Sequence, residues 1–216
     1  MTQAEMKDWT ETEKVILSRR SVRLYKDQQV PEDLVRRILE AGRFAPSAGN
    51  CQPWKFVVVR DKEILDALAG SVIAVCKNMV EMFGQAKPPD PLHPVPYSAV
   101  GMIAAGRFGI FHGAPTVILI FKDGRGVVNP DLDCGIAGQN MVLAAHSLGL
   151  GTCWVSFAGF AFQYVPEWQE RFGIEFPYEF VTSVAVGYPE GSPNGMAQRE
   201  THAVEWYENG SKKIVY

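Results

Sequence analysis

The feature that most constrains this chain is a run of 33 residues, from Cys134 to Pro166, without a single Asp, Glu, Lys or Arg. A charge-free stretch of this length is typical of a large core, a subunit interface or a membrane. A membrane helix needs about 20 predominantly apolar residues, whereas this run carries Gln139, Asn140 and His146 before it reaches a glycine-rich stop. We therefore predict a buried helix followed by a buried strand, in the centre of a core or at a subunit interface.

The remaining composition fits one globular domain that spans residues 1–216. The chain is 47% hydrophobic and 21% charged, which allows a substantial core and excludes a disordered, collagen-like or coiled-coil chain. A net charge of −3 argues against a protein that coats nucleic acid, because such binding depends on many phosphate contacts. A second apolar run, residues 102–121, is interrupted by Arg107, His112 and Pro115, so we predict no membrane span.

The four cysteines predict neither a metal site nor a disulfide scaffold. Cys51, Cys76, Cys134 and Cys153 are widely spaced, with no CxxC and no paired His motif, so zinc and iron–sulfur sites are not indicated. Four cysteines are also too few for a small secreted fold held by disulfides. The first residues are polar and acidic, unlike a secretory signal. We expect buried free thiols, no metal and a cytoplasmic location.

Apolar periodicity and turn residues predict helices that alternate with short buried strands. Helices are expected over residues 11–20, 31–44, 62–84, 131–148 and 167–172, with Gly70 as a candidate break. Strands are expected over residues 56–59, 116–121, 153–157 and 180–186. Five prolines between Lys87 and Pro96 predict an extended loop. The pattern indicates a mixed α/β or α+β domain with a small central sheet covered by helices.

The first candidate site is the segment Ser18–Arg23, SRRSVR. Its three guanidinium groups and two hydroxyls supply charge-assisted donors that suit phosphate oxygens. A solvated basic surface, a phosphorylation target or part of a nucleic-acid patch are the alternatives for so short a run.

The second candidate site is the segment Phe44–Trp54, FAPSAGNCQPW, between a predicted helix and a predicted strand. Its small residues allow a flat ligand to approach the backbone, and Ser47, Asn50 and Gln52 offer directed hydrogen bonds to ring heteroatoms. An ordinary helix-to-strand turn is the alternative, because Pro, Ser, Gly and Asn are frequent in turns.

Taken together and in this order, the motifs resemble those of the nitroreductase family of FMN-dependent oxidoreductases. The resemblance rests on RRSVR after a helix, PSAGNCQPW before a strand, DLDCGIAGQNMVLAAHSLGLGTCWVS, and a late GYP, and it extends from about Val15 to Tyr207. It implies an α+β fold: a three-layer α/β/α arrangement with a small, mixed but mainly antiparallel sheet flanked by helices. It also implies a homodimer with two FMN molecules at the interface, each contacted by both chains.

The resemblance further implies which residues contact the cofactor, because the flavin itself carries the chemistry and no catalytic side chain is expected. The implied contacts to the phosphate and ribityl chain are Arg19, Arg20, Ser21 and Arg23. The implied contacts to the isoalloxazine, from the other subunit, are Pro46, Ser47, Ala48 and Asn50. Backbone groups near the reactive N5 edge are implied around Val155, Ser156 and Phe157. Arg199 matches a late basic phosphate contact, although its surroundings, SPNGMAQRE, depart from the family's Lys/Arg-rich form.

The implied activity is a ping-pong transfer of hydride from NAD(P)H to nitroaromatics, quinones or related small acceptors. Ene-reduction, reductive dehalogenation and a flavin fragmentation that yields a cobalamin precursor are alternatives on the same fold. These reactions would differ in the lid, for which the candidates are the Pro88–Pro96 loop with the helix after it and the aromatic segment Phe157–Tyr164. The sequence has no G-x-G-x-x-G after a strand, so a nicotinamide would bind only transiently. A non-catalytic module that binds an acidic partner through Arg19–Arg23 is the alternative from another class.

Overall fold

The computed structural model describes residues 8–83, 97–125, 128–191 and 204–214. The helices are α1 (Glu11–Ser18), α2 (Glu32–Arg43), α3 (Lys62–Phe83), α4 (Tyr97–Ala104), α5 (Pro130–Ser147), α6 (Gly159–Tyr164) and α7 (Glu167–Arg171), with a 3-10 turn, η1, at Ala48–Asn50. The strands are β1 (Trp54–Val59), β2 (Thr116–Asp123), β3 (Gly151–Trp154), β4 (Tyr178–Gly187), β5 (Glu205–Glu208) and β6 (Ser211–Ile214).

Four of the strands form one antiparallel sheet in the order β1-β2-β4-β3, and β5 pairs with β6 in a separate hairpin. A parallel bridge between Ser21 and Thr152 adds the segment after α1 to the free edge of β3. The mainly antiparallel sheet is therefore confirmed, and its parallel component is this single bridge in the described part of the chain.

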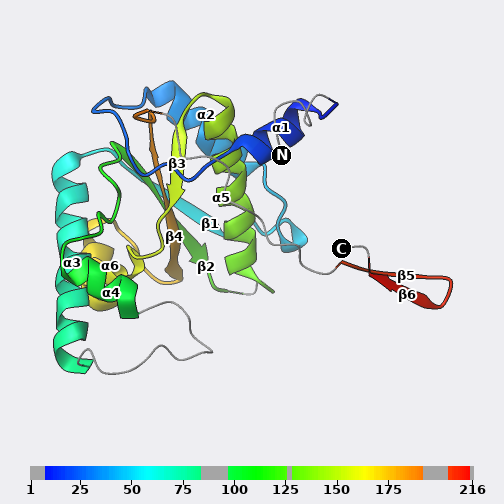
Figure 1. The fold of residues 1–216 in the computed structure, drawn as a ribbon. Coiled ribbons are helices and arrows are strands. Elements are labelled where there is room, and N and C mark those ends of the chain that lie inside the picture. Colours follow the sequence, from blue (N-terminus) through cyan, green and yellow to red (C-terminus); the bar gives the residue numbers. More distant parts are fainter. Residues whose placement is uncertain (1–7, 84–96, 126–127, 192–203, 215–216) are drawn as a thin grey trace.

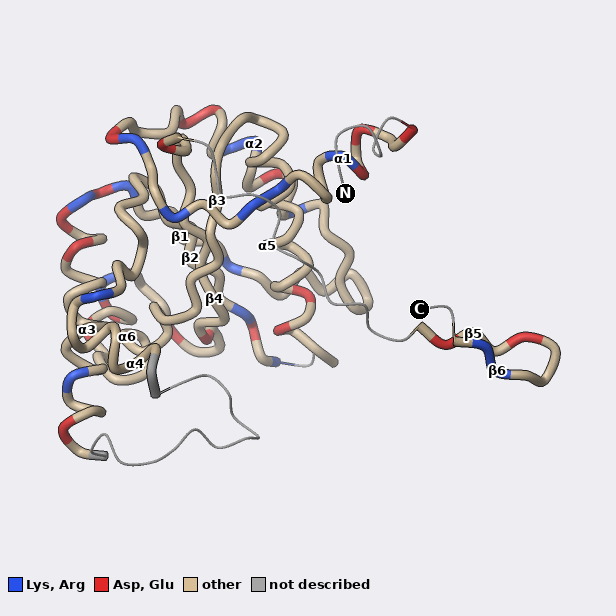
Figure 2. Tube along the Cα trace, in the orientation of Figure 1, with Lys and Arg blue, Asp and Glu red and all other residues tan. Residues whose placement is uncertain are grey.

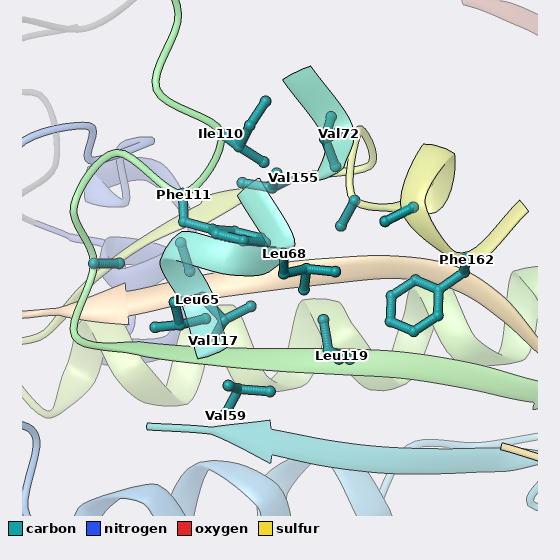
Figure 3. Close-up of a cluster of buried hydrophobic side chains, with 14 of the residues drawn as sticks. Val59, Leu65, Leu68, Val72, Ile110, Phe111, Val117, Leu119, Val155 and Phe162 are labelled. Atoms are coloured by element: carbon teal, nitrogen blue, oxygen red, sulfur yellow. The ribbon is translucent and has the colours of Figure 1, made fainter. Parts of the chain in front are cut away.

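Helices cover both faces of the sheet and produce three layers (Figure 1). Because successive side chains of a strand point to opposite faces, Ile118 and Ile120 of β2 pack in the cluster that includes α2 and α5. Leu119, from the same strand, packs in the other cluster, against α3, α4 and α6. Figure 3 shows this second cluster, which includes Leu68 and Val72 of α3 and Leu119 of β2. The predicted three-layer α+β fold is confirmed.

Several element boundaries differ from the sequence predictions. Helix α3 continues through Gly70, because one exposed glycine costs a long helix only about 1 kcal/mol. Strand β1 is longer than expected but mostly half-buried, since it lies at the edge of the sheet. Strand β3 ends at Trp154, and the chain then turns into α6, which the sequence analysis missed together with the β5–β6 hairpin. No helix in the described ranges is both long and apolar enough to cross a membrane.

The charge-free run begins inside α5, at Cys134, and this helix is buried on one side only. Its buried side reaches the sheet, where Gly138 lets the ring of Trp154 approach so closely that an added Cβ would lie 2.3 Å from the ring. Other positions face outward, such as Leu132, which is 56% exposed. The prediction of a wholly buried helix is therefore wrong for the single chain. For the exposed Leu132, a subunit interface stays the prediction.

Candidate cofactor site

The basic segment follows the end of α1 and lies along the free edge of β3. The amide of Val22 donates to the carbonyl of Thr152 at 2.8 Å, next to the Ser21–Thr152 bridge. Gly151 makes this approach possible, because an added Cβ would lie 2.6 Å from a methyl group of Val22. Figure 2 shows the resulting row of basic positions on the segment between α1 and α2. The sheet edge thus holds this segment in one place.

The basic segment creates a local positive potential that lowers the pKa values of two nearby histidines. Burial lowers the pKa of His146, and the charges of Arg19 and Arg20 lower it further. Burial also lowers the pKa of His112, followed by the charge of Arg23. Arg19 and Arg20 thus act on one histidine and Arg23 on the other, so each guanidinium adds to the positive potential around these two side chains.

The three arginines are not equivalent in the structure. The Nη1 group of Arg20 donates to the carbonyls of Leu17 at 2.7 Å and Arg19 at 2.8 Å, and so satisfies carbonyls at the end of α1. Ser21 and Arg23 are exposed. Arg20 therefore stabilises the end of α1. Ser21 and Arg23 face solvent, where a ligand can reach them.

The second predicted segment forms a tight turn around η1 and is held by its own side chains. Gly49, Asn50 and Gln52 have φ values of 57°, 56° and 48°, a left-handed conformation that is unusual for the two non-glycine residues. The amide of Gln52 donates to the Oγ of Ser47 at 2.9 Å. Positive φ values at non-glycine residues often mark functional sites. Cys51, in the same turn, is exposed, which corrects the expectation that all four thiols are buried.

A buried carboxylate connects this turn to α5. Both carboxylate oxygens of Asp133 accept from the amide of Ala48, at 3.2 and 3.3 Å. Asp133 was not among the predicted site residues, because an acidic residue in the first turn of a helix is common and does not by itself indicate a site. No signal in the sequence distinguishes Asp133 from the exposed Asp131 in the same turn.

The third predicted segment leaves the sheet directly after β3. The amide of Val155 donates to the carbonyl of Ser183 at 2.8 Å, and the Val155 carbonyl accepts from the Ser183 amide at 3.2 Å. The backbone of Val155 is therefore engaged, contrary to its expected role. The amides of Ser156 and Phe157 make no hydrogen bond within the described ranges, so these two remain as donors for a ligand.

An aromatic row lies beside these amides. The ring of Phe157 contacts Phe160 of α6 at 6.2 Å and Phe108 at 5.9 Å between centroids, and Phe108 contacts His112 at 5.2 Å. Neither Phe108 nor His112 was among the predicted site residues. The loop that carries both residues borders the site, because the charge of Arg23 lowers the pKa of His112 and the ring of Phe108 contacts that of Phe157.

A cavity of about 610 Å³ opens next to Ser156, between α6 and the start of β4. Phe160, Tyr178 and Phe180 contribute aromatic walls, and the volume is in the range of small-molecule sites. The lid candidate Phe157–Tyr164 is mostly the short helix α6, in which Phe162 belongs to the core. The other lid candidate, Pro88–Pro96, and Arg199 lie outside the described residues.

The single chain keeps the two halves of the predicted site apart. The basic segment meets α5 near its C-terminal end, where the Oγ of Ser18 lies 2.8 Å from Nε2 of His146. The turn Pro46–Asn50, which we call the PSAGN turn, contacts the N-terminal end of α5 at Asp133. The 13 residues between these positions correspond to about 20 Å along a helix. Within one chain, α5 therefore separates the Arg19–Arg23 segment from the turn.

Comparison with known proteins identifies the class. The model of the nitroreductase family matches residues 16–188. A relative from Methanothermobacter thermautotrophicus is 36% identical over 142 residues, which cover 64% of this chain and 57% of the relative. A 4-nitrobenzoate reductase from Pseudomonas putida is 28% identical over 87% of this chain and 93% of its own length.

The fold agrees with these matches. A nitroreductase from Desulfitobacterium hafniense, solved with bound FMN, superposes with a TM-score of 0.72 at 29% identity, over 88% of this chain and 95% of that one. The fold and the sequence motifs thus define an oxidoreductase of the nitroreductase type. This chain belongs to the nitroreductase family.

Proposed function

We propose that this chain forms a homodimer that binds FMN at the subunit interface, takes hydride from NAD(P)H and reduces nitroaromatics, quinones or related small acceptors by a ping-pong mechanism. The observation that carries the proposal is the fixed position of the Arg19–Arg23 segment on the edge of β3, the strand that leads into the Ser156 and Phe157 amides. The FMN bound to the D. hafniense relative and the substrate in the name of the P. putida relative support it.

The residues present fit the phosphate of FMN. Ser21 and Arg23 are exposed on a segment that the sheet fixes, and Arg19 lies near enough to Arg20 to act on the same histidine. A phosphate carries close to two negative charges, which guanidinium groups bind through paired hydrogen bonds. We assign Arg19, Ser21 and Arg23 to the phosphate and ribityl chain, with Arg20 as the residue that braces the end of α1.

The second half of the site comes from the other subunit. In one chain, α5 separates the basic segment from the PSAGN turn by about 20 Å. A two-fold axis that pairs the two α5 helices in antiparallel orientation would bring one chain's turn to the other chain's basic segment. The turn residues Pro46, Ser47, Ala48 and Asn50 would then line the flavin ring. The exposed Leu132 on α5 fits such an interface.

The chain's contribution is to bind, orient and exclude water. The amides of Ser156 and Phe157 would donate to the flavin edge, and the contacting rings of Phe108 and Phe157 would keep water from that side. FMN, when bound, supplies the two-electron chemistry between the nicotinamide and the acceptor. The cavity next to Ser156 has aromatic walls against which a planar acceptor would stack.

The test is an anaerobic titration of the purified protein after incubation with FMN. We expect a yellow protein whose melting temperature rises with FMN, because a ligand that binds only the folded state stabilises it. NADH or NADPH should bleach the flavin absorption, and a nitroaromatic or quinone should restore it. A protein that stays colourless, and that FMN does not stabilise, would contradict the proposal.

A further inference from the structure

Asp133 is a charged side chain in a place where charge is costly. It is 4% exposed, and it is the one carboxylate among the buried polar side chains of the described residues. A buried charge is destabilising unless hydrogen bonds compensate for its lost hydration. The first turn of α5 favours a negative charge, but a helix start would favour an exposed carboxylate equally well. The burial of Asp133 therefore needs another explanation.

That explanation lies in the partner of Asp133. Both carboxylate oxygens face the amide of Ala48, 85 residues away in the sequence. Ala48 is the first residue of η1 and is itself exposed. The bond thus connects a buried group of the core with the backbone of a surface turn, and a charged acceptor makes such a hydrogen bond stronger than a neutral one.

The turn requires an external support of this kind. Three of the four residues Gly49–Gln52 have positive φ. Two of them, Asn50 and Gln52, lack the freedom of glycine, so their conformation persists only where the surroundings impose it. The bonds of Ser47 and Asn50 to Gln52 are internal to the turn. They fix its shape, whereas the Asp133 bond fixes its position on α5.

We infer that Asp133 is a positioning residue for the flavin ring: it holds Ala48, and through it the Pro46–Asn50 turn, at the place where the turn lines the cofactor of the partner subunit. The inference rests on the proposed function. It adds a residue that touches no cofactor and lies outside the predicted set. It also means that the Pro46–Asn50 turn keeps a fixed position relative to α5.

The test compares Asp133→Ala and Asp133→Asn with the wild-type dimer. Asp133→Ala removes the acceptor of the Ala48 amide, and we expect the affinity for FMN to fall about ten- to a hundredfold, the loss typical of a hydrogen bond to a charged group. Asp133→Asn keeps one acceptor oxygen and should lose only about three- to tenfold. Hydrogen exchange at the Ala48 amide should accelerate in the same order.

Asp131→Ala is the matched control, because Asp131 lies in the same helical turn but is exposed and paired with Lys122. It should leave FMN affinity and Ala48 exchange unchanged. A folded Asp133→Ala protein that binds FMN no worse than Asp131→Ala would overturn the inference, even if its melting temperature were lower. If Asp133→Ala does not fold, Asp133→Asn decides by the same comparison. A wild-type protein without FMN affinity would instead refute the proposed function.

Discussion

Replacement of both Arg19 and Arg23 by Ala should lower the affinity for FMN by about a hundredfold or more. Each charge-assisted hydrogen bond to the phosphate contributes about 1.5–3 kcal/mol, and every 1.4 kcal/mol corresponds to about a factor of ten. The fold should survive, because the amide of Val22, and no side chain of the basic segment, pairs with Thr152 of β3. Equilibrium titration of apoprotein with FMN measures the loss.

Riboflavin, which lacks the phosphate, makes this prediction specific. The wild type should prefer FMN strongly over riboflavin, whereas the double variant should bind the two with similar affinity. Arg37→Ala is the control, since Arg37 is an exposed basic residue of α2 and its loss changes the net charge without touching the segment. A double variant that still discriminates in favour of FMN would place the phosphate elsewhere on the chain.

Phe44→Asp should convert the dimer to a monomer and remove the bound flavin together with it. Phe44 is 79% exposed in the single chain. It is the C-cap residue of α2 and precedes Pro46, the start of the PSAGN turn, by two positions. A large apolar side chain so exposed beside a two-chain site is expected to be covered by the partner, and a charge buried there would be costly. Sedimentation equilibrium and the ratio of flavin to protein measure both effects.

Met82→Asp is the matched control for this variant. Met82 is 78% exposed, but it lies on α3, in the layer of helices on the opposite side of the sheet from α2 and α5 (Figure 1). It should leave both the dimer and the flavin content unchanged. A monomeric Phe44→Asp protein that retains a full complement of FMN would show that one chain holds the cofactor alone.

The fold could be predicted where local patterns determine it. The run TVILIF became the buried β2, and the 3.6-residue periodicity of 131–148 became α5. Local patterns did not predict where tertiary context ends an element: β3 ends at Trp154, although the backbone of Val155 still pairs with Ser183 of β4. The aromatic segment Phe157–Tyr164 was a candidate lid, but one of its rings, Phe162 of α6, is buried in the core.

The candidate site shows the same division. The RRSVR and PSAGN motifs were visible in the sequence because their chemistry is local. Asp133 and Phe108 were not, because each acts through a contact with a residue that is far away in the chain. Likewise, no spacing reveals that the two motifs meet opposite ends of one helix. The proposed two-chain site rests on that separation.

Mixed dimers test whether each flavin site combines the basic segment of one chain with the turn of the other. Ala48→Trp should block the turn half, and the Arg19→Ala, Arg23→Ala chain lacks the phosphate half, so neither homodimer should hold FMN. After random re-association, half of the dimers are mixed, and each has one site with two intact halves. We predict that the mixture regains about a quarter of the wild-type FMN content; a mixture that regains none would contradict the shared site.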